Sequence, residues 1–125
     1  MAANPNAFQV PFNHGEVVWG SQDTTNSYVD LAASVVAWDV RGLRQKTVYV
    51  KNTGTTNAAD VKVLESTDNG ATWFSRTQLI QTALGHGDAV VFDCTDSATH
   101  IKVQAKSSED DAETTVYAAG CATQG

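Results

Sequence analysis

Apolar and polar side chains alternate along several short segments of this chain. The alternation is clearest in residues 47–51, 60–65, 100–106 and 114–118, and a period of two is typical of β-strands with one buried face. Residues 89–93 are apolar on both faces, which indicates a central strand. The apolar positions of these segments are expected to form the inner layers of the fold: Val48, Val50, Val61, Val63, Val90, Phe92, Ile101, Val103, Val116 and Ala118.

The pattern is less regular before residue 47. We interpret residues 1–26, which contain both prolines, as an extended N-terminal arm with a short strand at 16–19. Such an arm either ties onto a neighbouring subunit or packs on its own domain, and the residues leave both options open. Residues 34–39 predict a strand, with a short helix over 30–35 as the alternative.

These segments predict about seven to eight short strands separated by turns, at the spacing of a β-sandwich. Valine is the main aliphatic residue, which favours strands over helices. The expected fold is all-β: a single-domain antiparallel β-sandwich, jelly-roll or Ig-like, over residues 27–125. The chain has no internal repeat, and this excludes a propeller, which needs at least about four blades.

The most distinctive local motif is a hairpin turn in the middle of the chain. Ser66, Asp68, Gly70, Thr72 and Trp73 form the pattern Ser-x-Asp-x-Gly-x-Thr-Trp. Glycine suits a tight turn with positive φ, and the Ser, Asp and Thr side chains can hydrogen-bond nearby backbone groups. Trp73 adds a large apolar plate beside the turn. The motif resembles an Asp box, the hairpin repeated in sialidase propellers and found singly in other β proteins. We expect Asp68 to hold the turn rather than to react.

Composition and charge narrow the class of protein. The chain has 125 residues and 42% hydrophobic residues, which fits one domain with a modest core. Its net charge of −6 argues against a nucleic-acid partner, which needs clustered Lys and Arg. No segment has the apolar length of a membrane span, so no membrane partner is expected. Residues 1–10 lack a secretory signal, which predicts a protein that is made and used in the cytoplasm or leaves the cell by lysis, with a mature fragment restarted at Met as the remaining alternative. The acidic cluster at 109–113 is interpreted as a solvated loop rather than a calcium site.

The residues that usually carry chemistry are few and scattered. Cys94 and Cys121 are interpreted as two small buried residues rather than a disulfide. His14, His86 and His100 lie far apart and lack a helical metal-ligand spacing. The sequence therefore predicts no cofactor, no metal ion and no catalytic residue, and we expect a protein that is not an enzyme.

Several aromatic side chains are candidates for an interaction surface. Tyr49 and Tyr117 fall on the strand faces opposite the valines, so they are expected to be exposed. Tyr and Trp are enriched at subunit interfaces, and we assign Phe8, Phe12, Trp19, Tyr49 and Tyr117 to one. A sugar-stacking platform is the alternative interpretation of these aromatic residues.

The segments at 46–54, 61–64, 100–108 and 114–117, together with the hairpin turn, resemble small β-sandwich structural proteins of tailed bacteriophages. These include capsid decoration (cement) proteins and head or tail accessory proteins. The resemblance implies binding to the major capsid protein or other virion subunits, a homo-oligomer with a trimer favoured, and a location in the virion after assembly in the host cytoplasm. It carries over no catalytic residue.

Two other functions stay open at this point. The first is a carbohydrate-binding module or lectin-like adhesin that binds a glycan through the tryptophans and tyrosines. The second is a hydrolase, which has the weakest support because a single Asp-box turn without further catalytic residues is only a turn.

Overall fold

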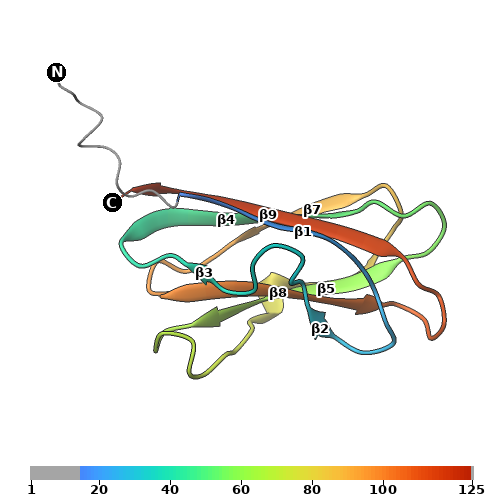
Figure 1. Ribbon diagram of the computed structural model, residues 1–125, viewed down its shortest axis with the longest axis horizontal. Coiled ribbons are helices and arrows are strands. Elements are labelled where there is room, and N and C mark those ends of the chain that lie inside the picture. The colour runs from blue at the N-terminus through green and yellow to red at the C-terminus, as the bar shows by residue number, and fades with distance from the viewer. Residues whose placement is uncertain (1–14, 125) are drawn as a thin grey trace, which may run out of the picture.

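The computed structural model describes residues 15–124, which form two antiparallel β-sheets packed face to face (Figure 1). We call the upper layer of the view sheet A and the lower layer sheet B. Almost all of the regular structure is β, and the predicted all-β antiparallel sandwich is confirmed.

Sheet A holds four strands in the order β1-β9-β4-β7. Their bounds are β1 (Glu16–Asp23), β4 (Leu43–Asn52), β7 (Ala89–Asp93) and β9 (Thr115–Gln124). Sheet B has the order β2-β8-β5-β6, and the short β3 also pairs with β8. The bounds here are β2 (Val29–Asp30), β3 (Trp38–Asp39), β5 (Ala59–Ser66), β6 (Ile80–Leu84) and β8 (His100–Ser107). A 3-10 turn, η2 (Thr77–Leu79), leads into β6.

The strand order identifies the sandwich as a jelly roll. The two-residue strands β2 and β3 both pair with β8 and can be counted as one strand. If the strands are then renumbered from one to eight along the chain, sheet A has the order 1-8-3-6 and sheet B has the order 2-7-4-5. This is the order of an eight-stranded jelly roll built from two Greek keys. Of the two sandwich types that the sequence left open, the structure therefore has the jelly roll and not the Ig-like form.

The core lies between the two sheets and is filled mainly by the alternating valines. Every predicted inner residue is buried except Val90, which is half-buried and packs against the core. Trp19 and Trp38 meet edge to face at the core, with ring centroids 5.9 Å apart and planes at 88°. The indole N–H of Trp19 donates to the carbonyl oxygen of Val36 at 2.8 Å, which satisfies its one polar atom.

The N-terminal boundary of the sandwich differs from the prediction. β1 pairs with β9 from Glu16 to Asp23, so the sheet begins ten residues before the predicted end of the arm. The expected strand at 16–19 exists, but the arm boundary at residue 26 is wrong. A β-bulge between Val18 and Gly20 interrupts the alternation, so the sequence pattern shows only the first part of this strand. The rest of the predicted arm, residues 1–14, lies outside the described residues.

Two other strand predictions need correction. β7 is an edge strand rather than a central one, and its apolar outer residue Val91 is 55% exposed. Residues 34–39 contain only the short β3, and the Ser34 N–H donates to the Trp19 carbonyl of β1 rather than to a strand of sheet B. After the hairpin turn, Phe74 forms one bridge to Glu65, and the chain then passes through η2 before β6 begins. The alternative helix over 30–35 is absent from the described residues.

Candidate functional site

The hairpin turn after β5 is held by its own side chains. The Oδ1 of Asp68 accepts from the Thr72 amide and from the Ser66 hydroxyl, both at 2.8 Å. The Oγ of Ser66 in turn accepts from the Gly70 amide at 2.8 Å. These hydrogen bonds lower the pKa of Asp68, with the Ser66 contact as the largest cause. Asn69 and Gly70 have φ of +62° and +91°, the left-handed conformation that the turn needs.

The same turn is tied to β8 and to its preceding loop. The Thr99 amide donates to the Ser66 carbonyl at 2.7 Å, and the Asn69 amide donates to the Thr99 hydroxyl at 3.0 Å. Trp73 is half-buried, and the ammonium group of Lys102 lies 4.7 Å from its ring centroid. Asp68 therefore has the geometry of a residue that fixes the backbone, because its bonded partners all belong to the turn.

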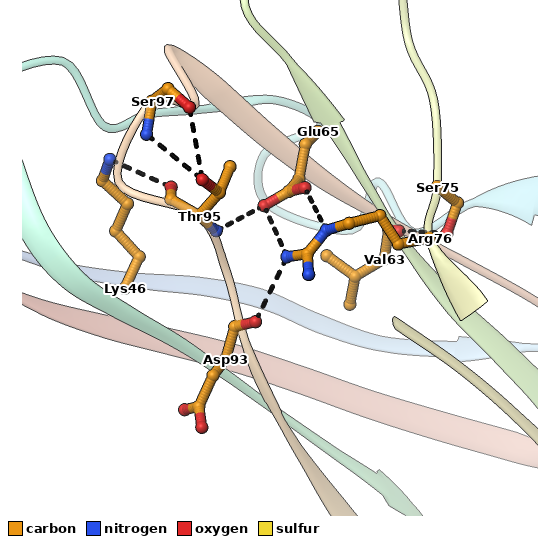
Figure 2. Close-up of polar contacts among 8 residues, drawn as sticks. All are labelled: Lys46, Val63, Glu65, Ser75, Arg76, Asp93, Thr95 and Ser97. Carbon is orange, nitrogen blue, oxygen red and sulfur yellow. Dashed lines mark hydrogen bonds and ion pairs between the residues drawn. The ribbon is translucent and has the colours of Figure 1, made fainter. Parts of the chain in front are cut away.

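A buried polar cluster lies behind this turn, and Figure 2 shows its contacts. Glu65 has no exposed side-chain area, and both of its carboxylate oxygens are occupied. Oε1 accepts from Arg76 Nε at 3.1 Å, while Oε2 accepts from the Thr95 amide at 2.6 Å and from Arg76 at 3.4 Å. The hydrogen bond with Glu65 raises the pKa of Arg76. Removing one partner of such a buried pair is strongly destabilising, and both oxygens of Glu65 already bond to groups of the protein.

Lys46 supplies the other half of the cluster from sheet A. Its side chain is buried, and Nζ donates to the carbonyl oxygens of Asp96, Ala98 and Thr95 at 2.8, 3.2 and 3.4 Å. Burial lowers the pKa of Lys46, and the nearby charge of Asp96 partly offsets this. The loop between β7 and β8 is thus bound by one charged residue from each sheet, which closes this end of the sandwich.

Neither buried charge was recognised from the sequence as part of a cluster. The signal was nevertheless present in the alternation. Lys46 has the same parity as the inward Val48, and Glu65 has the same parity as the inward Val63. Charged residues are almost never fully buried unless paired, so the charge of Lys46 and of Glu65 favours an exposed position for each side chain.

The two cysteines are free thiols in different environments. Cys94 is half-buried and packs against the core, and burial raises its pKa to about 12. A thiol with this pKa is almost entirely protonated at neutral pH and is a poor nucleophile. Cys121 is exposed on β9, which corrects the prediction that both cysteines are buried. A hydrogen bond with Cys121 raises the pKa of the neighbouring Tyr49.

The outer face of sheet A carries apolar side chains in register across all four strands. The pairings Val18–Ala119, Ala119–Tyr49 and Tyr49–Val91 connect β1, β9, β4 and β7 in one line. Val18, Tyr49 and Val91 are 49%, 47% and 55% exposed, and Ala119 is half-buried between them. We call these four residues the apolar row. The clustering distinguishes them from single exposed apolar residues, which are normal on soluble proteins.

The structure sorts the predicted interface residues into three groups. Tyr49 is exposed in the apolar row, and Tyr117 is half-buried on the same face of the sheet. Trp19 is fully buried, so its assignment to an interface is wrong; it has the same parity as Val17, which also packs against the core. Phe8 and Phe12 lie outside the described residues. The sequence missed Val18 and Val91, whose apolar character suits an inner position equally well.

The remaining candidates for chemistry show no assembled site. Within residues 15–124, no group of three His, Cys, Asp or Glu side chains gathers with a geometry for a metal ion. The acidic loop between β8 and β9 is attached to Asn26, whose amide oxygen accepts from the Asp111 amide at 2.8 Å. No helix in the described part of the chain is long and apolar enough to cross a membrane.

Comparisons with known proteins place the chain in no family. No protein-family model matches it, and no curated protein matches it. Among solved structures, the crystal structure of the T13 IBDV viral particle is similar, with a TM-score of 0.48 and 12% sequence identity. The match covers 88% of this chain and 30% of that chain, so this chain spans less than a third of the viral one. At this TM-score the similarity carries no argument about function.

Proposed function

We propose that this protein is a non-enzymatic structural protein of a virus particle. It binds the major capsid protein or other virion subunits and stabilises the capsid lattice, as decoration or cement proteins do, or a tail or neck assembly. The observation that carries the proposal is the apolar row on the outer face of sheet A. Exposed apolar patches with a polar rim mark surfaces that bind other proteins.

The polar chemistry of the described residues supports a binding role over a catalytic one. Glu65, Arg76 and Lys46 are engaged in bonds that hold the fold, and Asp68 is engaged within its turn. The protonated thiol of Cys94 lacks the thiolate character that nucleophilic catalysis requires. Jelly rolls occur in viral capsid and lectin domains, which agrees with the proposal by analogy of fold only.

The mechanism follows from mass action. A protein that binds only the assembled lattice lowers the free energy of that state and not of the separate subunits. Multiple copies on one particle, or several binding faces in one oligomer, raise the avidity without any new contact. No reaction at a site is needed, so a sandwich with a well-packed core is suited to the role.

The test uses particles assembled without this protein, from the virus that encodes it. Purified protein is added, and co-sedimentation and the temperature of genome release are measured. We expect binding and a higher release temperature, and we expect Val91→Glu to abolish both. Val36→Glu is the matched control, because Val36 is also an exposed valine, at 41%, but lies outside the apolar row. Equal binding by both variants would reject the row as the binding surface.

Glycan binding is a second candidate, and the outer face of sheet B favours it. Two half-buried aromatic rings lie there, Tyr28 and Trp73, each with a lysine ammonium group above it. Lys62 is 4.2 Å from the Tyr28 centroid, and Lys102 is 4.7 Å from the Trp73 centroid. A sugar that stacks on either ring has to displace a lysine, so an acidic glycan fits better than a neutral one. A glycan array with wild-type protein and Trp73→Ala tests this, and a silent array would reject it.

A further inference from the structure

We propose that the apolar row packs against the same row of a second copy, so that two chains associate through the outer faces of sheet A about a two-fold axis. The inference deepens the proposed function by naming the first partner of that surface, and it rests on that function only in treating the row as an interaction surface. Closed two-fold dimers are the commonest homo-oligomers, and each half of such an interface is the same patch.

The size and shape of the face suit this pairing. The row crosses four hydrogen-bonded strands, and such a face measures roughly 19 Å by roughly 27 Å for about eight residues per strand. Two faces of this size bury on the order of 1,000 Å², where specific interfaces begin. Sheets pack face to face at about 10 Å with their strands nearly aligned, which is the arrangement expected of two stacked copies of this face.

Charged residues lie on both sides of the apolar row, and their signs differ. On one side, the next paired positions form what we call the acidic row: Glu16, Cys121, Thr47 and Asp93. On the other side, the paired positions form what we call the lysine row: Ser21, Tyr117, Lys51 and Ala89. Glu16, Asp93 and Lys51 are all exposed on the sheet. The face is therefore apolar in the middle, acidic on one flank and basic on the other.

This asymmetry selects one orientation of the second copy. A two-fold axis along the apolar row puts the acidic row of each copy over the lysine row of the other, and Asp93 then lies beside Lys51 of the second copy. An axis along the strands instead puts Asp93 over Glu16 of the second copy, which places like charges together. Complementary charges fix the register of an interface, and like charges oppose it. We therefore assign the axis to the direction of the apolar row.

Such a pair also differs from the trimer that the sequence resemblance favours. A patch that pairs with itself closes after two copies, whereas a three-fold ring needs two different patches on each chain. The apolar row is a single patch that lies across the middle of the sheet. Its symmetry-related partner occupies it in the free protein, so a third copy has no place on it, and the dimer has to dissociate before the row binds a virion subunit.

The first experiment measures the mass of the purified full chain by light scattering over a micromolar concentration series. We expect a monomer–dimer equilibrium for the wild type and for Val36→Glu, and a monomer at all concentrations for Val91→Glu. A trimer, or a monomer for the wild type at every concentration, would overturn the inference. A dimer that Val91→Glu leaves intact would also overturn it, because the dimer then uses another surface.

A charge-reversal experiment tests the orientation. Lys51→Glu and Asp93→Lys should each weaken the dimer roughly tenfold, and the double variant should restore the wild-type dissociation constant, because it recreates the pair with opposite signs. Failure of the double variant to recover would overturn the assigned axis. If wild-type protein is monomeric yet still binds particles through the row, the inference fails while the proposed function stands. If it is monomeric and does not bind particles, both fail.

Discussion

Lys46 and Glu65 hold the same loop from opposite sheets of the sandwich. Nζ of Lys46 donates to the Asp96 carbonyl at 2.8 Å, and Oε2 of Glu65 accepts from the Thr95 amide at 2.6 Å. Both side chains are buried on the inward faces of their strands. The loop thus offers carbonyl oxygens to the buried ammonium group of Lys46 and an amide N–H to the buried carboxylate of Glu65. This arrangement explains how charged residues occupy positions that the strand alternation assigns to the core.

Glu65→Gln should lower the free energy of unfolding by about 2 kcal/mol, because hydrogen bonds to a buried charge are replaced by weaker neutral ones. The Thr95 amide keeps an acceptor, while Arg76 loses its ion pair. Urea titration measures the change. Asp39→Asn is the control, since it removes an ion pair with Arg41 whose side chains are 49% and 58% exposed. An exposed pair of this kind contributes little, so equal effects of the two substitutions would contradict the assigned role of Glu65.

Ser66→Ala should destabilise the hairpin turn by about 1–3 kcal/mol, because the Gly70 amide loses its acceptor inside the turn. Ser66 itself has no exposed area. The thermal unfolding midpoint measures the effect. Ser97→Ala in the neighbouring loop is the matched control, because Ser97 is exposed and should change stability little. No difference between the two alanine variants would show that the turn is held by other contacts.

The strand alternation predicted most of the fold, since the inward valines of β4, β5, β8 and β9 follow it directly. The predictions failed where an outer face is apolar. Val91 gives β7 the composition of a central strand, although the strand lies at an edge and presents that side chain outward. Val18 and Trp19 lie in the predicted strand at 16–19, but the bulge after them shifts the period, so the continuation of β1 to Asp23 was missed. The sequence therefore predicted only Tyr49 of the apolar row as exposed. The row as a whole could not be predicted, because its members come from four strands and meet only through their register.

The pKa of Cys94 predicts a dependence of stability on alkaline pH. Burial raises that pKa from an ordinary 9.0 to about 12, so the folded thiol keeps a proton that the unfolded chain releases near pH 9. The stability that the protonated Cys94 thiol contributes is fully present below pH 9. The free energy of unfolding then falls as pH rises from 9 towards 12, by at most about 1.4 kcal/mol per pH unit. Urea titrations at several pH values measure the slope, with Cys121→Ser in every protein.

Comparison with Cys94→Ala isolates this contribution. Lys46 acts in the opposite sense, because its folded-state pKa is lowered and stability rises with pH below its ordinary 10.5. Both proteins contain Lys46, so the difference between their slopes belongs to Cys94. The alanine variant should lose stability less steeply above pH 9. Parallel slopes would contradict the buried, protonated state of the thiol.

The most direct test of the proposed binding surface uses the Cys121 thiol as a natural probe. Cys121 is exposed in the acidic row, next to the apolar row, whereas Cys94 is half-buried with a raised pKa and should stay unreactive in the folded chain. The measurement is the alkylation rate of Cys121 at neutral pH, in free protein diluted until it is monomeric and in assembled virus particles. We expect rapid modification of the free protein and strong protection on the particle, because a subunit covers the outer face of sheet A. Equal rates in the two states would contradict the assignment of this face as the binding surface.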